Sequence, residues 1–188
     1  MDSLAGKILL AMPNMDDPRF HRAVILICAH DENGAMGLVI NHPLPGLSFA
    51  GMLDELNIAH EDVKPEALSN IAVYGGGPVE NARGFILHSL DFSLHDTIKI
   101  TDDLGVTGTI DGLRAVAAGE GPQEMIFVLG YSGWTSGQLE REIQGNVWLV
   151  AEIDQNLVFS VPVDEKWTYG IKTLGVDLAM LSGDAGRA

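Results

Sequence analysis

The chain has 188 residues, 46% of them hydrophobic, which suits one domain with a substantial core. Eleven Lys and Arg against 26 Asp and Glu give a formal charge of −15. Nucleic-acid affinity depends largely on basic residues that neutralise phosphates, so this charge argues against direct DNA or RNA binding and also disfavours an anionic membrane surface.

The N-terminal apolar run is too short for a membrane span and lacks the basic start of a signal peptide, so we expect a cytoplasmic protein. No Pro/Ser-rich linker divides the chain. We therefore expect a single domain over residues 1–188, with an ordered core from about residue 4 to 180 and a loose tail at 182–188. Cys28, the only cysteine, has apolar neighbours and is expected to be a buried, inert thiol.

Short apolar runs bounded by turn residues predict strands along the whole chain. These runs are residues 7–12, 23–29, 36–40, 71–74, 84–90, 97–101, 125–129, 147–153 and 157–161. Asp31-Glu32-Asn33-Gly34 is a strong turn signal and predicts a hairpin over residues 23–40. A second hairpin is expected around residues 154–156.

Helical spacing and capping signals predict four helices, over residues 49–56, 109–118, 136–144 and 164–174. Ser48, Thr109 and Asp164 are the expected N-caps. The strands come in hairpin runs and do not alternate one for one with helices. The sequence therefore predicts an α+β fold with a mostly antiparallel, strongly bent sheet.

The stretch GYSGWTSGQ, residues 130–138, is expected to be a tight turn between a strand and a helix. A serine-nucleophile turn would need G-x-S-x-G, but Trp134 stands where its second glycine should be. A catalytic histidine would follow the serine, whereas the last histidine, His95, precedes Ser132. Both observations argue against serine hydrolysis.

Two other interpretations of residues 130–138 stay open. Glycines and hydroxyls before a helix could bind an anion, although the spacing matches no known phosphate-binding loop. Alternatively the stretch is a structural joint, because Thr135 and Gln138 have the spacing of a capping box. Trp134 and Trp148 would then be packing anchors on either side of the helix.

The run Gly75-Gly76-Gly77-Pro78 predicts an irregular turn that approaches either the rest of the fold or a ligand. The six histidines show no metal-binding spacing, so we expect no metal site. His30 and His42 flank the first hairpin and could meet at its open end, whereas His88 is expected in the core. The cationic cluster Pro18-Arg19-Phe20-His21-Arg22 could attract an anionic ligand or partner, but we expect its charges to pair with nearby carboxylates.

Many of these residues together resemble the YqgE/AlgH family of bacterial proteins. The residues that carry the resemblance are Leu4, Gly6, Leu9, Leu10, Pro13, Phe20, His30, Gly34, Gly37, Asn41, Gly75-Gly76-Gly77-Pro78-Val79, Leu87-His88, Leu129-Gly130-Tyr131, Gly133-Trp134, Gly137-Gln138-Leu139-Glu140, Glu142, Asn146, Trp148, Trp167 and Leu174-Gly175. The resemblance implies an open pseudo-barrel and brings no established reaction. Relatives are sometimes described as transcriptional regulators, and the charge of −15 favours an indirect role over DNA contact.

We therefore expect a binding protein, without catalytic residues or a cofactor, whose partner is an unidentified protein or small molecule. The expected contact residues are His30, Asn41, Gly75, Gly76, Gly77, Pro78, Gly130, Tyr131, Ser132, Gly133, Trp134 and Gln138. The alternative is a hydrolase or transferase that acts on an anionic metabolite at Gly130–Gln138, with His30 or His88 as general acid or base. The sequence leaves the oligomeric state open.

Overall fold

The computed structural model describes residues 3–177 and 181. The expected tail, residues 182–188, lies outside these residues. The strands are β1 (Lys7–Ala11), β2 (Val24–Asp31), β3 (Gly34–Val39), β4 (Val73–Gly75), β5 (Val79–Ser89), β6 (Ile98–Lys99), β7 (Leu104–Thr107), β8 (Met125–Thr135) and β9 (Trp148–Glu152). The helices are α1 (Phe49–Glu55), α2 (Pro65–Ser69), α3 (Ile110–Ala117), α4 (Gln138–Gln144) and α5 (Lys166–Thr173), with a 3-10 turn η1 (Pro18–Phe20) and a π-helical turn η2 (Asn156–Ser160).

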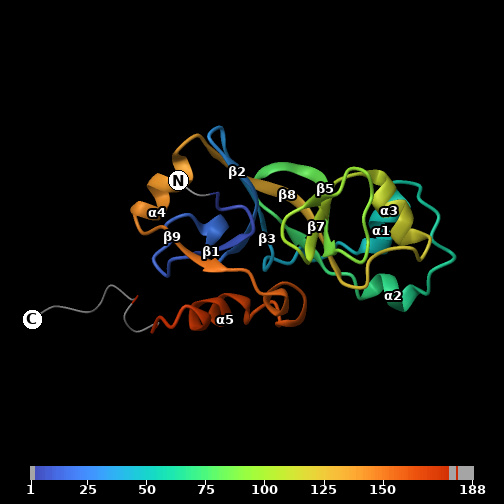
Figure 1. The fold of residues 1–188 in the computed structure, drawn as a ribbon. Helices are drawn as coiled ribbons and strands as arrows, with labels where there is room; N and C mark the ends of the chain where they lie inside the picture. Colours follow the sequence, from blue (N-terminus) through green and yellow to red (C-terminus); the bar gives the residue numbers. More distant parts are fainter. Residues whose placement is uncertain (1–2, 178–180, 182–188) are drawn as a thin grey trace, which may run out of the picture.

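The strands form one curled sheet in the order β6-β7-β5-β8-β3-β2-β1-β9, with β4 paired to β8. Among the described strand pairs, all are antiparallel except β4–β8. Figure 1 shows α1, α2 and α3 gathered at the β5–β7 end of the sheet, α4 at the β9 end and α5 beneath. The predicted α+β fold with a mostly antiparallel, strongly bent sheet is confirmed.

Strand β8 joins the two halves of the sheet. Its first part pairs with β4 and β5, and its last part, residues 132–135, pairs with β3. Between the two parts, Gly130 takes a left-handed backbone conformation (φ 72°), which glycine adopts without a Cβ penalty. The strand therefore bends at Gly130 and continues, while the β5–β8 pairing is interrupted opposite this residue by a register shift between Val79 and Gly84.

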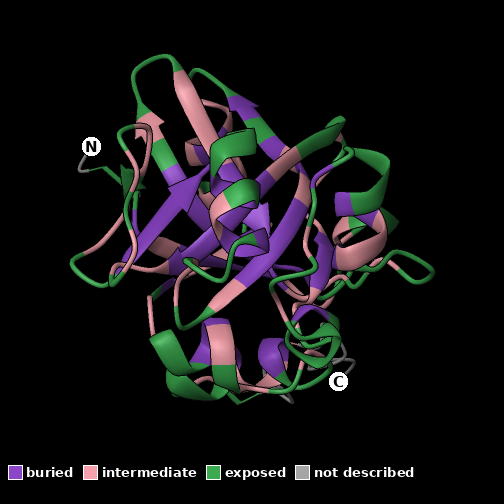
Figure 2. Cartoon of the chain, turned by 90° about the vertical axis from the view of Figure 1, so that its right-hand side faces the viewer, coloured by how far each residue is buried: buried purple, intermediate pink, exposed green. Residues whose placement is uncertain are grey.

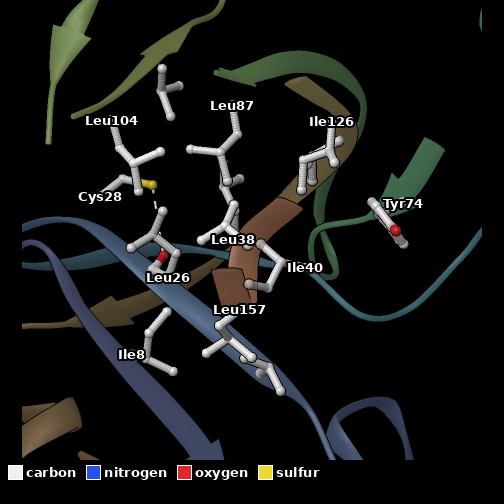
Figure 3. Packing of buried hydrophobic residues seen from close by; sticks show 14 of the residues in the cluster. Ile8, Leu26, Cys28, Leu38, Ile40, Tyr74, Leu87, Leu104, Ile126 and Leu157 are labelled. Carbon is white, nitrogen blue, oxygen red and sulfur yellow. Dashed lines mark hydrogen bonds between the residues drawn. The ribbon is translucent and has the colours of Figure 1, made fainter. Parts of the chain in front are cut away.

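Buried side chains on the two faces of this sheet form three clusters. The largest lies between the curled sheet and α5, and Figure 3 shows Ile8, Leu26, Leu87 and Leu104 pointing into it. A second cluster packs under α1 and α3, and a third under α4. Figure 2 shows the buried residues concentrated along the strands and on the inner faces of the helices.

Cys28 lies in the largest cluster, as expected of a structural thiol (Figure 3). Burial raises the pKa of its thiol to about 12. At neutral pH the group is therefore a thiol and not the reactive thiolate.

Several local predictions are confirmed. Residues 23–40 form the β2–β3 hairpin across Asp31 and Gly34. The Oγ of Ser48 accepts a hydrogen bond from the backbone N–H of Gly51 at 3.0 Å, so Ser48 caps α1 as predicted.

The second hairpin and the N-cap of α5 differ from the prediction, and β7 and α2 were not predicted. The second hairpin does not form, because residues 156–160 are a π-helical turn whose adjacent Leu157 and Val158 are both buried, and β9 pairs with β1 instead. A short apolar run cannot distinguish these outcomes by periodicity. The strand at Leu104–Thr107 was not predicted. The N-cap of α5 is Glu165 and not Asp164.

Candidate functional site

A cleft of about 470 Å³ lies between the loop before β2, the end of β8 and the α4–β9 connection. Its walls come from residues 14–17, 19–20, 78, 132–134, 138, 142 and 145–148. These segments lie far apart in the sequence, so the cleft exists only because β8 continues past Gly130 and pairs with β3.

The end of β8 places α4 beside the cleft. Thr135 and Gln138 make half of the predicted capping box, since the backbone N–H of Thr135 donates to Gln138 Oε1 at 3.0 Å. The reciprocal bond is absent, and Gly137 (φ 68°) occupies the N-cap position. This joint fixes Gln138 one turn before Glu142 on the cleft side of α4.

Glu142 accepts hydrogen bonds from three different side chains of the cleft. Its Oε2 accepts hydrogen bonds from the indole N–H of Trp134 at 2.8 Å and from that of Trp148 at 2.7 Å. Its Oε1 accepts from Gln138 Nε2 at 2.9 Å. One carboxylate thus accepts hydrogen bonds from the N–H groups of two buried indoles. It cannot rotate without breaking its three hydrogen bonds.

Aromatic rings build the wall behind this carboxylate. Trp134 and Trp148 meet edge to face with centroids 6.1 Å apart, and Phe20 packs on Trp148 in the same way at 5.7 Å. The predicted role of the two tryptophans as packing anchors is confirmed. Glu142 was not assigned to the site from the sequence, although buried indole N–H groups need acceptors and Glu142 lies on the helix between them.

Arg19 and Asp17 form a salt bridge with each other at the rim of the cleft. Arg19 Nε contacts both carboxylate oxygens, at 3.0 and 3.1 Å, and Nη2 donates to Oδ2 at 2.6 Å. These hydrogen bonds from Arg19 lower the pKa of the Asp17 carboxyl. The expectation that cations of this segment pair with carboxylates is confirmed for Arg19.

Residues 130–134 are not the turn that the sequence predicts. They belong to β8, because Gly130 absorbs the bend and Ser132–Thr135 find partners in β3 that no local pattern reveals. Of the predicted contact residues, Pro78, Ser132, Gly133, Trp134 and Gln138 do line the cleft. Tyr131 instead packs against the core, with its ring 6.2 Å from that of Phe85.

Gly75, Gly76 and Gly77 approach the rest of the fold. A Cβ on Gly76 would lie 2.3 Å from the carbonyl oxygen of Gly130, and one on Gly77 would lie 2.4 Å from Ser132 Oγ. These glycines therefore allow close contact between this segment and β8. Ser132 is 1% exposed, and its hydroxyl donates to the carbonyl of Gly76 at 3.1 Å.

His30 and Asn41 lie outside the cleft in structural roles. The N–H of Leu4 donates to His30 Nδ1 at 2.9 Å, so Nε2 carries the proton that bonds Glu140 Oε1 at 2.9 Å. Asn41 accepts from the N–H of Val24 and donates to the carbonyl of Arg22, both at 2.8 Å. Each side chain therefore fastens neighbouring segments together.

The remaining histidines do not supply catalytic groups to the cleft. The expected meeting of His30 and His42 is wrong: His30 lies near the turn of the β2–β3 hairpin, and His42 contacts the carbonyl of His21 at 3.2 Å near the other end. His88 is fully buried, as predicted, with Nε2 2.9 Å from Thr107 Oγ1. Burial lowers its pKa.

Metal and membrane features are also absent from the described part of the chain. Residues 3–177 and 181 hold no group of three or more His, Cys, Asp or Glu side chains able to bind a metal ion. Among the same residues, none of the helices has the length and apolar character needed to cross a bilayer.

A second hollow, of about 330 Å³, lies between α1, α3 and β5. Its lining is apolar apart from Glu55 and Thr109. It offers shape and hydrophobic surface but few directional contacts, so the first cleft is the better candidate for specific recognition.

Comparison with known proteins decides the family. The profile of the AlgH-like family matches residues 8–179. The chain belongs to the AlgH-like family. A UPF0301 protein of Cereibacter sphaeroides is 50% identical over 188 residues, which cover 98% of this chain and 99% of that protein. A UPF0301 protein of Bradyrhizobium diazoefficiens is 47% identical over 98% of this chain and 88% of its own length.

Solved structures agree with this assignment. The solution structure of the AlgH protein from Pseudomonas aeruginosa matches with a TM-score of 0.78 and 40% identity, and covers 99% of this chain and 96% of that one. A Corynebacterium diphtheriae protein shares the fold at a TM-score of 0.73 and 20% identity, over 97% of this chain and 92% of that one. The AlgH-like resemblance drawn from the sequence is thereby confirmed.

Proposed function

We propose that this AlgH-like protein is a non-enzymatic cytoplasmic binding protein whose ligand or partner enters the cleft beside Trp134 and Trp148. The observation that carries the proposal is Glu142, which three hydrogen bonds hold in one orientation at the wall of an open hollow. Such preorganised polar groups beside apolar walls are typical of ligand sites. A regulatory role would then act through binding and not through DNA contact.

The alternative, a hydrolase or transferase at Gly130–Gln138, loses its chemical support. The hydroxyl of Ser132 is buried and donates to the Gly76 carbonyl, so it faces no base. His30 is engaged by Leu4 and Glu140, and His88 by Thr107. A nucleophile needs a base within hydrogen-bond reach, and the described histidines offer Ser132 none.

Indole N–H signals in NMR spectra test the proposed cleft. Trp134 and Trp148 report on the cleft, whereas Trp167, which donates to the Ala11 carbonyl at 2.8 Å, is an internal control in the α5 core. A diverse panel of small metabolites and fragments, each added at millimolar concentration, should contain members that shift the two cleft indoles and leave Trp167 unchanged. A panel that moves none of them selectively would overturn the proposal.

A fluorophosphonate probe distinguishes binding from hydrolysis. We expect no labelling of the native protein, and the same result for Ser132→Ala. Rapid stoichiometric labelling that Ser132→Ala abolishes would instead identify a serine enzyme.

A further inference from the structure

The charges that line the cleft do not balance. The lining contains three carboxylates, Asp16, Asp17 and Glu142, and one guanidinium, Arg19, so its formal charge is −2. Arg19 is paired with Asp17 through Nε and Nη2. Asp16 and Glu142 are therefore left as the two carboxylates that no cation of the described chain neutralises.

The surroundings of Glu142 make its charge unusual. Its three hydrogen-bond partners are neutral donors, two indoles and one amide. It is only partly exposed and stands against two buried tryptophans, which are 7% and 3% exposed. A carboxylate in such low-dielectric surroundings interacts with a nearby cation more strongly than a fully hydrated one does.

Glu142 also retains capacity to bind. A carboxylate has about four acceptor positions, two on each oxygen. The two indoles occupy those of Oε2, and Gln138 occupies one of Oε1. One position on Oε1 is left for a donor that enters the cleft.

The rest of the cleft suits an apolar body attached to that donor. Apolar side chains come from Met15 and Phe20 on the loop before β2 and from Val147 on the α4–β9 connection. Asp16, exposed at the rim, adds a second negative charge along the path of entry. The whole molecule, at −15, also attracts cations and repels anions.

We infer that the cleft recognises a small organic cation, an ammonium or amidinium-type group joined to an apolar body, with the cation hydrogen-bonded to Glu142 Oε1. This inference rests on the proposed function, because it names the ligand class of the same cleft. The ligand inferred here has the opposite charge to the anionic metabolite considered from the sequence. The lining offers two unpaired carboxylates to a cation, whereas its one cationic side chain is already paired with Asp17.

Benzamidine, benzamide and benzoate test the inference as a matched set, because they share one ring and differ mainly in charge. Benzamidine should shift the indole signals of Trp134 and Trp148 but not that of Trp167. Benzamide should bind at least tenfold more weakly, and benzoate should not bind. Phenethylamine, tested beside benzamidine, distinguishes an ammonium preference from an amidinium preference, and selective binding of either supports the inference.

Glu142→Gln removes one charge from the cleft at nearly constant shape. It should weaken benzamidine binding about tenfold, which corresponds to about 1.4 kcal/mol. Asp16→Asn, on an exposed side chain without bonds to the described chain, should weaken it about two- to threefold while leaving the fold intact. Glu61→Gln is the matched control, since it removes the same charge at an exposed position outside the cleft and should change affinity by less than a factor of two.

The outcomes separate this inference from the proposed function. If benzamide binds as well as benzamidine, or Glu142→Gln and Asp16→Asn leave benzamidine affinity unchanged, the cleft is a binding site but not a cation site. If benzoate binds best, the inference is overturned in the same way. If neither these probes nor the fragment panel shift the cleft indoles, both proposals fail.

Discussion

Lys166 is a buried cation without a carboxylate partner in the described chain. It is 2% exposed, and its Nζ donates to the carbonyls of Val158 at 2.6 Å and Ile40 at 3.2 Å. The ring of Tyr74 lies 5.4 Å away. Removal from water disfavours the ammonium form, and burial lowers the pKa of Lys166 to about 8.

This shift makes stability depend on pH in a defined direction. Between the folded pKa of about 8 and the usual value of 10.5, the folded chain binds fewer protons at Lys166 than the unfolded chain. Lys166 should therefore raise the free energy of unfolding with pH, by about 1–2 kcal/mol between pH 7 and 9.5. Cys28, whose thiol pKa is raised from 9.0 to about 12 by burial, ionises in the unfolded chain over the same range and should offset part of this rise. Urea unfolding at half-unit steps measures the rise and stops at pH 9.5, below the ordinary tyrosine pKa of about 10.

Two variants test whether Lys166 causes this rise in the free energy of unfolding. Lys166→Met should abolish it and leave the small fall caused by Cys28, whereas Lys172→Met, at an exposed position of the same helix, should preserve it. A rise that persists unchanged in Lys166→Met would show that another group causes it.

At the level of elements, the bend in β8 depends on one residue. Gly130 has φ 72°, and a Cβ there would lie 2.8 Å from the Gly77 carbonyl oxygen and 3.0 Å from that of Val79. Gly130→Ala should therefore lower the free energy of unfolding by about 2–4 kcal/mol, through backbone strain and the clash together. Urea denaturation measures the loss.

Gly133→Ala is the matched control in the same strand. Its Cβ would meet no atom closer than the Tyr131 ring at 3.5 Å, an ordinary contact, and its backbone is not left-handed. We expect a change below about 1 kcal/mol. Equal losses in the two variants would contradict the assignment of the bend to Gly130.

The full length of β8 could not be predicted from the sequence, unlike the elements that depend on local signals. The β2–β3 hairpin and α1 were predictable, because Asp31-Glu32-Asn33-Gly34 and Ser48 act on their immediate neighbours. The continuation of β8 was not, since its glycines favour a turn locally and its partner β3 lies about a hundred residues earlier. Turn residues and N-caps predict the structure of their neighbours in the sequence, but not the pairing of strands that lie far apart in it.

The candidate site divides in the same way. Trp134 and Gln138 were found from a capping pattern and a glycine-dense stretch next to each other in the sequence. Asp16 and Phe20 were not, because only the folded chain brings their loop beside α4 and β9. The hydrogen bonds of Glu142 likewise depend on the tertiary approach of Trp148 to Trp134.

On the scale of the whole molecule, β8 pairs with β5 in one half of the sheet and with β3 in the other. The two halves therefore cannot separate without breaking strand pairs of β8. All three tryptophans lie in the clusters under α4 and α5, whereas Ile86 lies in the cluster under α1 and α3. Tryptophan fluorescence therefore observes one half of the molecule, and backbone circular dichroism observes both. A shared central strand should make their unfolding a single transition.

Ile86→Val tests this coupling from the half that fluorescence does not observe. The lost methylene in a side chain that is 1% exposed should cost about 1 kcal/mol. If the halves unfold together, the urea midpoint by fluorescence falls as far as the midpoint by circular dichroism. Ile25→Val, on the fluorescent side, should give the same agreement from the other direction. A fluorescence midpoint that Ile86→Val leaves unmoved while the dichroism transition broadens would show two units that unfold separately, with β8 as a connector and not a common core.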